Sequence, residues 1–414
     1  MIDPADLRPA TAEDWPRFGR AMDVVFGEPS TGPYLDTPTP LAELDRSLGL
    51  FGEDGRVHAT AGIYSLEMTV PGGAAVPTAG ITWITVSPAR RRQGVLTALM
   101  RRQLDEVHAA GREPLAALWA AEAGIYGRFG YAPAAVKGGW SVDPTRVRLR
   151  PDVPAGEGRV TLVDVEEFRP AAAALYERVR REVPGTMARD DRWWTRTLRD
   201  DEEQRHGATP RQLALHTEPD GTVTGYATHR LKAAWTEGGL PDTTMTVQEV
   251  RSATPAAHTA LWRFLLGHDL VRRLTYEAGP AGEPVQHLLV DPRPLASRPF
   301  DGLWVRLVDV DRALAARRYP APIDLVIEVR DPFCPWNEGR WRLSGHPAGG
   351  YCGRTDRDPD LVLGIEELGA AYLGGTSLAA LHAAGRVTEV SPGAVTLAST
   401  SFSWPVAPWC VTEF

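Results

Sequence analysis

The chain has 414 residues, 43% hydrophobic and 24% charged, which is typical of a globular protein of about two to four domains. Its net charge of -8 disfavours a nucleic-acid-binding protein, because such proteins need positive charge to displace counterions from phosphates. The charge suits a cationic substrate better. No apolar run is long enough for a membrane span, and the beginning, MIDPADLRPATAEDW, lacks a signal-peptide pattern, so we expect a cytoplasmic protein.

The first 150 residues predict the order strand, helix, antiparallel strands, helix, strand. LRPATAEDWPRFGRAMDVVFGE fits a short strand and then a helix with an acidic start. Residues 56–88 alternate apolar and small side chains and break at PGG, which predicts two or three antiparallel strands. A helix from about Gly94 to Ala110 and a strand at PLAALWA complete one α/β unit.

The same order of elements repeats after PDVPAGEG, residues 151–158, which has the composition of a linker. VTLVDVEEFRPAAAALYERVRR repeats the opening strand and helix, and TMTVQEVRSATPAAHTALWRFLLGHDL matches GITWITVSPARRRQGVLTALMRRQL. A duplicated fold is the simplest explanation. Where the first copy has a basic turn, however, the second has SATPAAHTA, without an arginine cluster or a glycine.

From about Pro292 onward, amphipathic helices alternate with short strands, as in an α+β domain. We therefore predict an α/β (α+β) protein of three domains, residues 1–150, 151–291 and 292–414. The three cysteines, Cys334, Cys352 and Cys410, are widely spaced and predict isolated buried thiols. No metal site is predicted, because neither cysteines nor histidines have the spacing of metal ligands.

The stretch VSPARRRQGVLTALM, residues 86–100, passes from a strand through three arginines and a glycine into a helix. A glycine there lets backbone N–H groups converge on an anion, and the helix dipole adds positive potential. The arginines add charge-assisted contacts to phosphate oxygens. One turn is too small to follow a nucleic-acid backbone but suits the pyrophosphate of coenzyme A. The alternative is a solvated basic cap that binds nothing.

Arg91, Gly94 and Leu96 after the strand ITWITV resemble the acetyl-CoA motif Q/R-x-x-G-x-G/A of GNAT acyltransferases, with Leu96 as a departure. With AGIYGRFGYAP and the terminal WCVTEF, the chain resembles the Eis (enhanced intracellular survival) family of bacterial N-acetyltransferases over essentially its whole length. The resemblance implies two GNAT-like domains in tandem, the second degenerate, then a sterol-carrier-like domain whose C-terminus reaches the active site. It also implies acetyl-CoA as co-substrate and a homo-hexamer.

The resemblance implies how acetyl-CoA is held. The predicted contacts are the strand residues Ile84, Thr85 and Val86, and the turn and helix residues Arg91, Arg92, Gly94, Val95 and Leu96. The family often has a serine before the glutamate of S-E-G-G-I-Y. This chain has Ala121 before Glu122, so we expect one hydroxyl contact to be missing.

Two catalytic residues are predicted for direct attack of an amine on the thioester. Tyr126, whose phenol has an ordinary pKa of about 10, is the candidate acid for the departing thiolate, although it could simply be a packed aromatic. Phe414 ends the chain, and by resemblance its α-carboxylate is a base or an anchor for the amine. Chain ends more often fray and have no role.

The candidate acceptor pocket contains acidic and aromatic residues. Glu413 and Glu28 would attract a polycation, and Trp83 and Phe26 would form walls, although core packing equally explains Phe26. Aminoglycosides are the best-known acceptors of the family, and polyamines or protein lysines are alternatives. A non-catalytic acyl-CoA-binding or lipid-binding protein is the rival interpretation. We expect no nucleic-acid or membrane partner.

Overall fold

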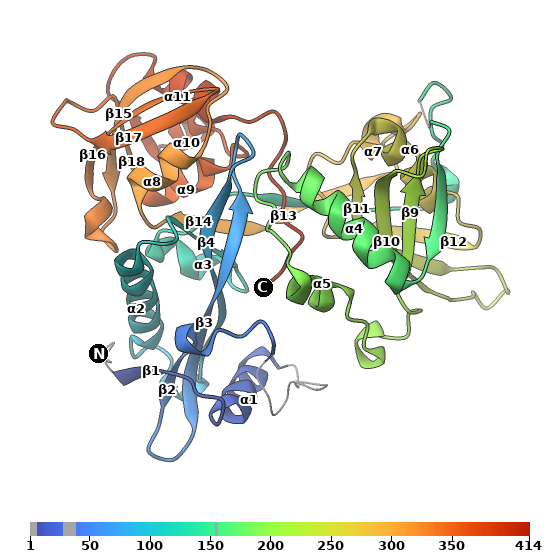
Figure 1. Cartoon of the computed structure of the whole chain (residues 1–414), viewed down its shortest axis with the longest axis horizontal. Helices are drawn as coiled ribbons and strands as arrows, with labels where there is room; N and C mark the ends of the chain where they lie inside the picture. The colour runs from blue at the N-terminus through green and yellow to red at the C-terminus, as the bar shows by residue number, and fades with distance from the viewer. Residues whose placement is uncertain (1–5, 28–38, 154–155) are drawn as a thin grey trace. The chain divides into compact units, whose positions relative to one another are not determined.

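The computed structural model describes residues 6–27, 39–153 and 156–414, drawn in colour in Figure 1. Contacts between residues divide the chain into two units. The first takes in residues 1–135, 302–405 and 413–414, and the second takes in residues 136–301 and 406–412. The last two residues of the chain therefore belong to the first unit, although the seven before them belong to the second.

The first unit contains a sheet in the order β1-β2-β3-β4-β5-β14-β6. Its strands are β1 (Leu7–Pro9), β2 (Leu48–Phe51), β3 (Val57–Thr69), β4 (Ala75–Val86), β5 (Leu115–Trp119), β14 (Leu303–Leu307) and β6 (Ala132–Pro133). Three helices accompany them: α1 (Trp15–Phe26), α2 (Val95–Ala110) and α3 (Ala123–Tyr126). Residues 56–88 form two antiparallel strands, β3 and β4, and β4 pairs in parallel with β5.

Helix α2 packs against the sheet of the first unit through one apolar face. Met100, Leu104 and Val107 follow one another at helical spacing and are almost completely buried against sheet residues such as Ile81. Burial of each such side chain contributes about 1.5–3 kcal/mol. The helix ends at Gly111, which takes the left-handed conformation with φ of 61°.

The first unit also contains a second sheet, in the order β17-β16-β15-β18-β19. Its strands are β15 (Ile323–Arg330), β16 (Gly339–His346), β17 (Gly349–Arg354), β18 (Leu361–Gly364) and β19 (Val387–Glu389). Four helices belong to this region: α8 (Val310–Ala316), α9 (Ile365–Tyr372), α10 (Leu378–Ala383) and α11 (Ala394–Phe402). This is the alternation of helices and short strands predicted after Pro292.

The second unit is built on a sheet in the order β13-β7-β12-β11-β10-β9-β8. Its strands are β7 (Val136–Val142), β8 (Arg159–Val163), β9 (Gln212–Thr217), β10 (Val223–Lys232), β11 (Thr243–Ser252), β12 (Val271–Tyr276) and β13 (Ala296–Asp301). Its helices are α4 (Val165–Arg180), α5 (Asp191–Leu198), α6 (Pro255–Leu266) and α7 (Val285–Leu288). The parallel pair β11 and β12 flanks α6 in sequence, as β4 and β5 flank α2 in the first unit.

Two strands join a sheet other than that of the strand that precedes them in sequence. β7 follows β6 directly but pairs with β12 and β13 in the second unit. β14 follows β13 but inserts between β5 and β6 in the first unit. Such an exchange has no local sequence signal, because strand pairing depends on partners far away in the chain.

Candidate active site

The parallel strands β4 and β5 separate at one end. Their pairing runs from Thr78 opposite Leu115 to Ile81 opposite Leu118. β5 ends one residue later, whereas β4 continues to Val86. The edge of β4 that faced β5 is therefore left for another group beyond Ile81. This segment contains Ile84, Thr85 and Val86, the strand residues predicted to contact acetyl-CoA.

A bulge accompanies the separation of β4 from β5. The register between β3 and β4 shifts between Thr60 and Gly62, and Trp83 takes a positive φ of 55°. The Thr60 hydroxyl donates to the carbonyl of Trp83 over 2.6 Å, which fixes this unusual backbone. A Cβ on Gly62 would lie 2.6 Å from the Trp83 ring, so the bulge depends on that glycine.

Trp83 lies in an aromatic cluster. Its ring meets Trp15 and Phe18 of the α1 segment edge-on, with centroids 5.5 and 6.3 Å away, and Tyr64 at 5.1 Å. The residues that line the neighbouring cavity do not include Trp83. Its prediction as an acceptor wall stays a prediction, and packing already accounts for its position.

The turn between β4 and α2 presents backbone donors. A 3-10 turn at Pro88–Arg90 leads to Arg92 with φ of 61° and to Gly94 with φ of 85°. Gly94 is the N-cap of α2, and no side chain caps this helix. The first N–H groups of the helix, which have no partner within it, are thus available to a ligand together with the positive end of the helix dipole.

A cavity of about 650 Å³ joins the free edge of β4 to this helix start. All eight predicted co-substrate residues line it, as do Tyr126 and Phe26. Ala121 and Glu122, where a hydroxyl contact was expected to be missing, also line it. Five further lining residues were not predicted from the sequence: Val25, Arg90, Thr97, Ile125 and Arg128. Arg128, two residues after Tyr126, could have been noticed as a second source of positive charge.

The cavity is strongly basic. In the part of the chain that the structure describes, Arg90, Arg91, Arg92 and Arg128 line it, against a single carboxylate from Glu122. Among the described residues, the first three arginines make no ion pair that would neutralise them. The positive charge and the uncapped helix fit the pyrophosphate of a coenzyme, and the open edge of β4 fits its amide-containing arm.

Tyr126 ends the short helix α3, and only 8% of its side chain is exposed. Burial, together with the charge of Glu122, raises the pKa of its phenol above the ordinary value. The hydroxyl is therefore protonated at neutral pH and can donate a proton. Its ring meets Tyr131 edge-on at 6.5 Å, which fixes its orientation.

The end of the chain lies beside the same two strands. The Phe414 ring meets Trp119, the last residue of β5, edge-on at 6.5 Å. A Cβ on Gly80 of β4 would lie 3.2 Å from that ring. The terminal carboxylate is thus carried by a residue packed where β4 and β5 begin to separate, although Phe414 is not among the cavity-lining residues.

The remaining acceptor residues are only partly described. Phe26 ends α1, is half-exposed and lines the cavity. Glu413 is exposed. Glu28 lies outside the described residues.

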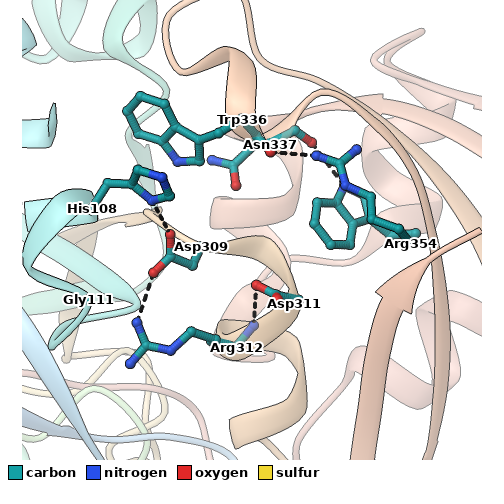
Figure 2. Close-up of a pocket in the computed structure, with 9 residues that line it drawn as sticks. His108, Gly111, Asp309, Asp311, Arg312, Trp336, Asn337 and Arg354 are labelled. Atoms are coloured by element: carbon teal, nitrogen blue, oxygen red, sulfur yellow. Dashed lines mark hydrogen bonds and ion pairs between the residues drawn. The ribbon is translucent and has the colours of Figure 1, made fainter.

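Another pocket of the first unit, of about 500 Å³, has a different character. Figure 2 shows His108 stacked on Trp336, with ring centroids 4.2 Å apart, and its Nδ1 2.6 Å from Asp309. The same Asp309 accepts a hydrogen bond from Arg312, and the guanidinium of Arg354 lies 3.9 Å from the Trp341 ring. Unlike Arg90, Arg91 and Arg92 of the larger cavity, Arg312 and Arg354 already have partners within the protein.

Two features are absent from the described residues: a group of metal-ligating side chains and a helix that could span a membrane. No group of three or more His, Cys, Asp or Glu side chains in these ranges could hold a metal ion. No described helix is long and apolar enough to cross a membrane. The three cysteines are free and buried, as predicted.

Models of three known domain families match the chain. An acetyltransferase (GNAT) domain matches residues 6–134, a second acetyltransferase (GNAT) domain matches residues 185–307, and a sterol carrier protein domain matches residues 310–411. The predicted fold class, two GNAT-like domains followed by a sterol-carrier-like domain, is confirmed. The GNAT domains also imply an acyl-CoA co-substrate.

Similar proteins cover nearly the whole chain. An uncharacterized N-acetyltransferase of Streptomyces avermitilis is 45% identical over 98% of this chain and 98% of its own length. The N-acetyltransferase Eis of Mycobacterium tuberculosis is 35% identical over 91% of each chain. Among solved structures, Eis1 of Mycobacterium abscessus matches with a TM-score of 0.84 and 33% identity, over 99% of this chain and 100% of its own.

Proposed function

Because this chain belongs to the Eis family of N-acetyltransferases, we propose that it transfers the acetyl group of acetyl-CoA to amines of polycationic small molecules such as aminoglycosides. The observation that carries the proposal is the cavity that joins the open edge of β4 to the uncapped start of α2. The net charge of the whole chain, -8, favours a cationic acceptor.

The chain has groups suited to hold each part of acetyl-CoA. The backbone of Ile84, Thr85 and Val86 would bind the pantetheine amides, in place of a neighbouring strand. The N–H groups that follow Gly94, with Arg91 and Arg92, would bind the pyrophosphate. Ala121 and Glu122 line the cavity without the hydroxyl that a serine would provide.

Tyr126 and the Phe414 carboxylate would divide the proton transfers. The neutral amine attacks the thioester carbonyl, and Tyr126 donates its proton to the departing thiolate. The carboxylate of Phe414 accepts the proton released by the amine, directly or through water, or holds the amine in place. No covalent enzyme intermediate is required, because the amine itself is the nucleophile.

The test is a thiol-release assay with acetyl-CoA against aminoglycosides, polyamines and lysine-containing peptides. We expect turnover with aminoglycosides. Turnover of polyamines or peptides alone would mean that these, and not aminoglycosides, are the acceptors. Tight CoA binding without turnover of any amine would favour a non-catalytic carrier. We also propose that the protein is cytoplasmic and forms a homo-hexamer. Light scattering of the purified protein measures the mass of the assembly and so tests the hexamer.

Deletion of Glu413 and Phe414 tests the role of the chain end. We expect kcat to fall by about a hundredfold, in the range of one acid or base group, with little change in the KM of acetyl-CoA. Unchanged turnover would show that the end of the chain is structural.

A further inference from the structure

The second unit repeats the separation of parallel strands, but the strand that continues carries different side chains. β11 and β12 pair from Thr243 opposite Val271 to Thr246 opposite Thr275, and β11 then continues to Ser252. The extension carries two buried charged residues, Glu249 and Arg251. In the first unit the corresponding extension, from Thr82 to Val86, lines the co-substrate cavity through its last three residues.

A buried ion network is built on this extension. Glu249 Oε2 lies 3.0 Å from Arg189 Nη1, and its Oε1 accepts from Arg251 Nε over 2.9 Å. The Tyr226 hydroxyl donates to the same carboxylate over 3.0 Å. Burial raises the pKa of Glu249, but Arg189 and Arg251 outweigh burial and hold the pKa below its usual value. Two cations thus share one carboxylate.

The network holds the C-terminal segment of the chain. Arg189 Nε donates to the Thr412 hydroxyl over 3.1 Å, and the Arg251 guanidinium lies 4.0 Å from the Trp409 ring. The Trp409 N–H donates to the Pro184 carbonyl over 2.8 Å, and its indole Nε1 donates to the Ala278 carbonyl over 2.7 Å.

The segment is buried as well as bonded. Trp409, Cys410 and Thr412 are only 4%, 2% and 5% exposed. Trp409 belongs to the apolar core of the second unit, which also contains Trp262 and Tyr276. A chain end usually frays, and packing of this kind is what prevents fraying.

We propose that Arg189 is a positioning residue for catalysis: held by Glu249, it fixes Thr412 and thereby keeps the terminal carboxylate of Phe414 in place. Only Glu413 separates Thr412 from Phe414, so few backbone torsions lie between the bonded hydroxyl and the carboxylate. The catalytic part of this inference rests on the proposed function. In the second unit, Arg251 on the extension of β11 contacts Trp409 of the C-terminal segment, and no such contact occupies the extension of β4 among the described residues that line its cavity.

Thr412→Val tests the inference with the least disturbance, because it removes the acceptor of Arg189 and keeps the volume of the side chain. We expect carboxypeptidase to release Phe414 about tenfold faster and kcat to fall about tenfold, as for one charge-assisted hydrogen bond, with the KM of acetyl-CoA unchanged. The matched control is Thr195→Val, which removes the bond from the Thr195 hydroxyl to the Asp191 carbonyl within α5. The control should change neither release nor kcat.

A double-variant experiment separates positioning from general destabilisation. In a protein that lacks Glu413 and Phe414, Thr412→Val should have no further effect on kcat, because the group that it positions is gone. If Thr412→Val lowered kcat by the same factor in the truncated protein as in the full-length protein, the positioning role would be overturned.

The two readouts also distinguish this inference from the proposed function. Unchanged release of Phe414 from the Thr412→Val protein would overturn the inference. Faster release with unchanged kcat would confirm that Arg189 holds the chain end but reject the catalytic role of Phe414.

Discussion

The two GNAT copies have the same parallel strands and following helix, but they begin that helix differently. In the first copy α2 begins after Gly94, with no side-chain cap. In the second copy α6 begins with Pro255, and the hydroxyl of Thr254 accepts a hydrogen bond from the N–H of Ala257. A proline has no N–H and a capped N–H is already bonded, so the second helix start offers fewer donors to an anion.

The comparison indicates which features distinguish the copy that we propose to be catalytic. Both copies separate their parallel strands, at Ile81 in the first and at Thr246 in the second. The separation therefore does not by itself make a co-substrate site. The uncapped helix, the arginines of the turn and the open strand edge occur together in the first copy alone, among the residues that the structure describes.

The largest expected effect is that of Tyr126→Phe, which removes the proposed acid. We expect kcat to fall by about 10² to 10⁴, the usual contribution of general acid catalysis, with the KM of acetyl-CoA unchanged. A thiol-release assay measures both constants. Tyr131→Phe, a change in the buried tyrosine next to it, is the control. Full activity of Tyr126→Phe would leave this ring with a packing role only.

Gly94→Thr gives the first copy the N-cap residue of the second. Threonine at a φ of 85° costs about 1–2 kcal/mol, and its hydroxyl would compete for the free N–H groups, so we expect the KM of acetyl-CoA to rise about tenfold. Gly94→Ala is the control, because alanine shares the strain at a positive φ but has no side-chain group that could compete for the N–H groups. Equal KM values for the parent protein and the Gly94→Thr variant would show that the first copy does not depend on its glycine.

Thr254→Val makes the converse change by removing the cap of the second copy. We expect a loss of about 1 kcal/mol in the free energy of unfolding, because the N–H of Ala257 loses its acceptor. Denaturant unfolding measures the loss. The KM of acetyl-CoA should stay the same, and a rise would mean that the second copy contributes to co-substrate binding.

The smallest expected effect is a shift in pH dependence. The Tyr126 phenol donates only while it is protonated, so activity is lost as the pH rises through its pKa. Burial and Glu122 both raise that pKa, so Glu122→Gln should move the alkaline limb of the kcat profile to lower pH. The midpoint of this limb should still lie at a higher pH than the pKa of an exposed phenol, because the variant leaves Tyr126 buried. An unchanged alkaline limb would mean that the loss of activity at high pH comes from a group other than Tyr126.

Much of the site could be predicted from local sequence. The basic turn, Gly94 and the strand ITWITV lie within 16 residues of one another, and the structure places all eight predicted co-substrate residues around one cavity. Arg128 was missed, although its position two residues after Tyr126 placed it near the predicted site. Whether Tyr126 and Phe414 act as proposed stays a prediction, since position alone does not establish proton transfer.

The sequence by itself determined the duplicated order of elements, the helix starts and the loss of the basic turn in the second copy, because these depend on neighbours in the chain. Only the tertiary structure decided that β7 and β14 pair in sheets formed mainly by other segments, and that Arg189 bonds to Thr412, 223 residues away. Such partners are brought together by packing and hydrogen bonding across the fold, and no local spacing records them.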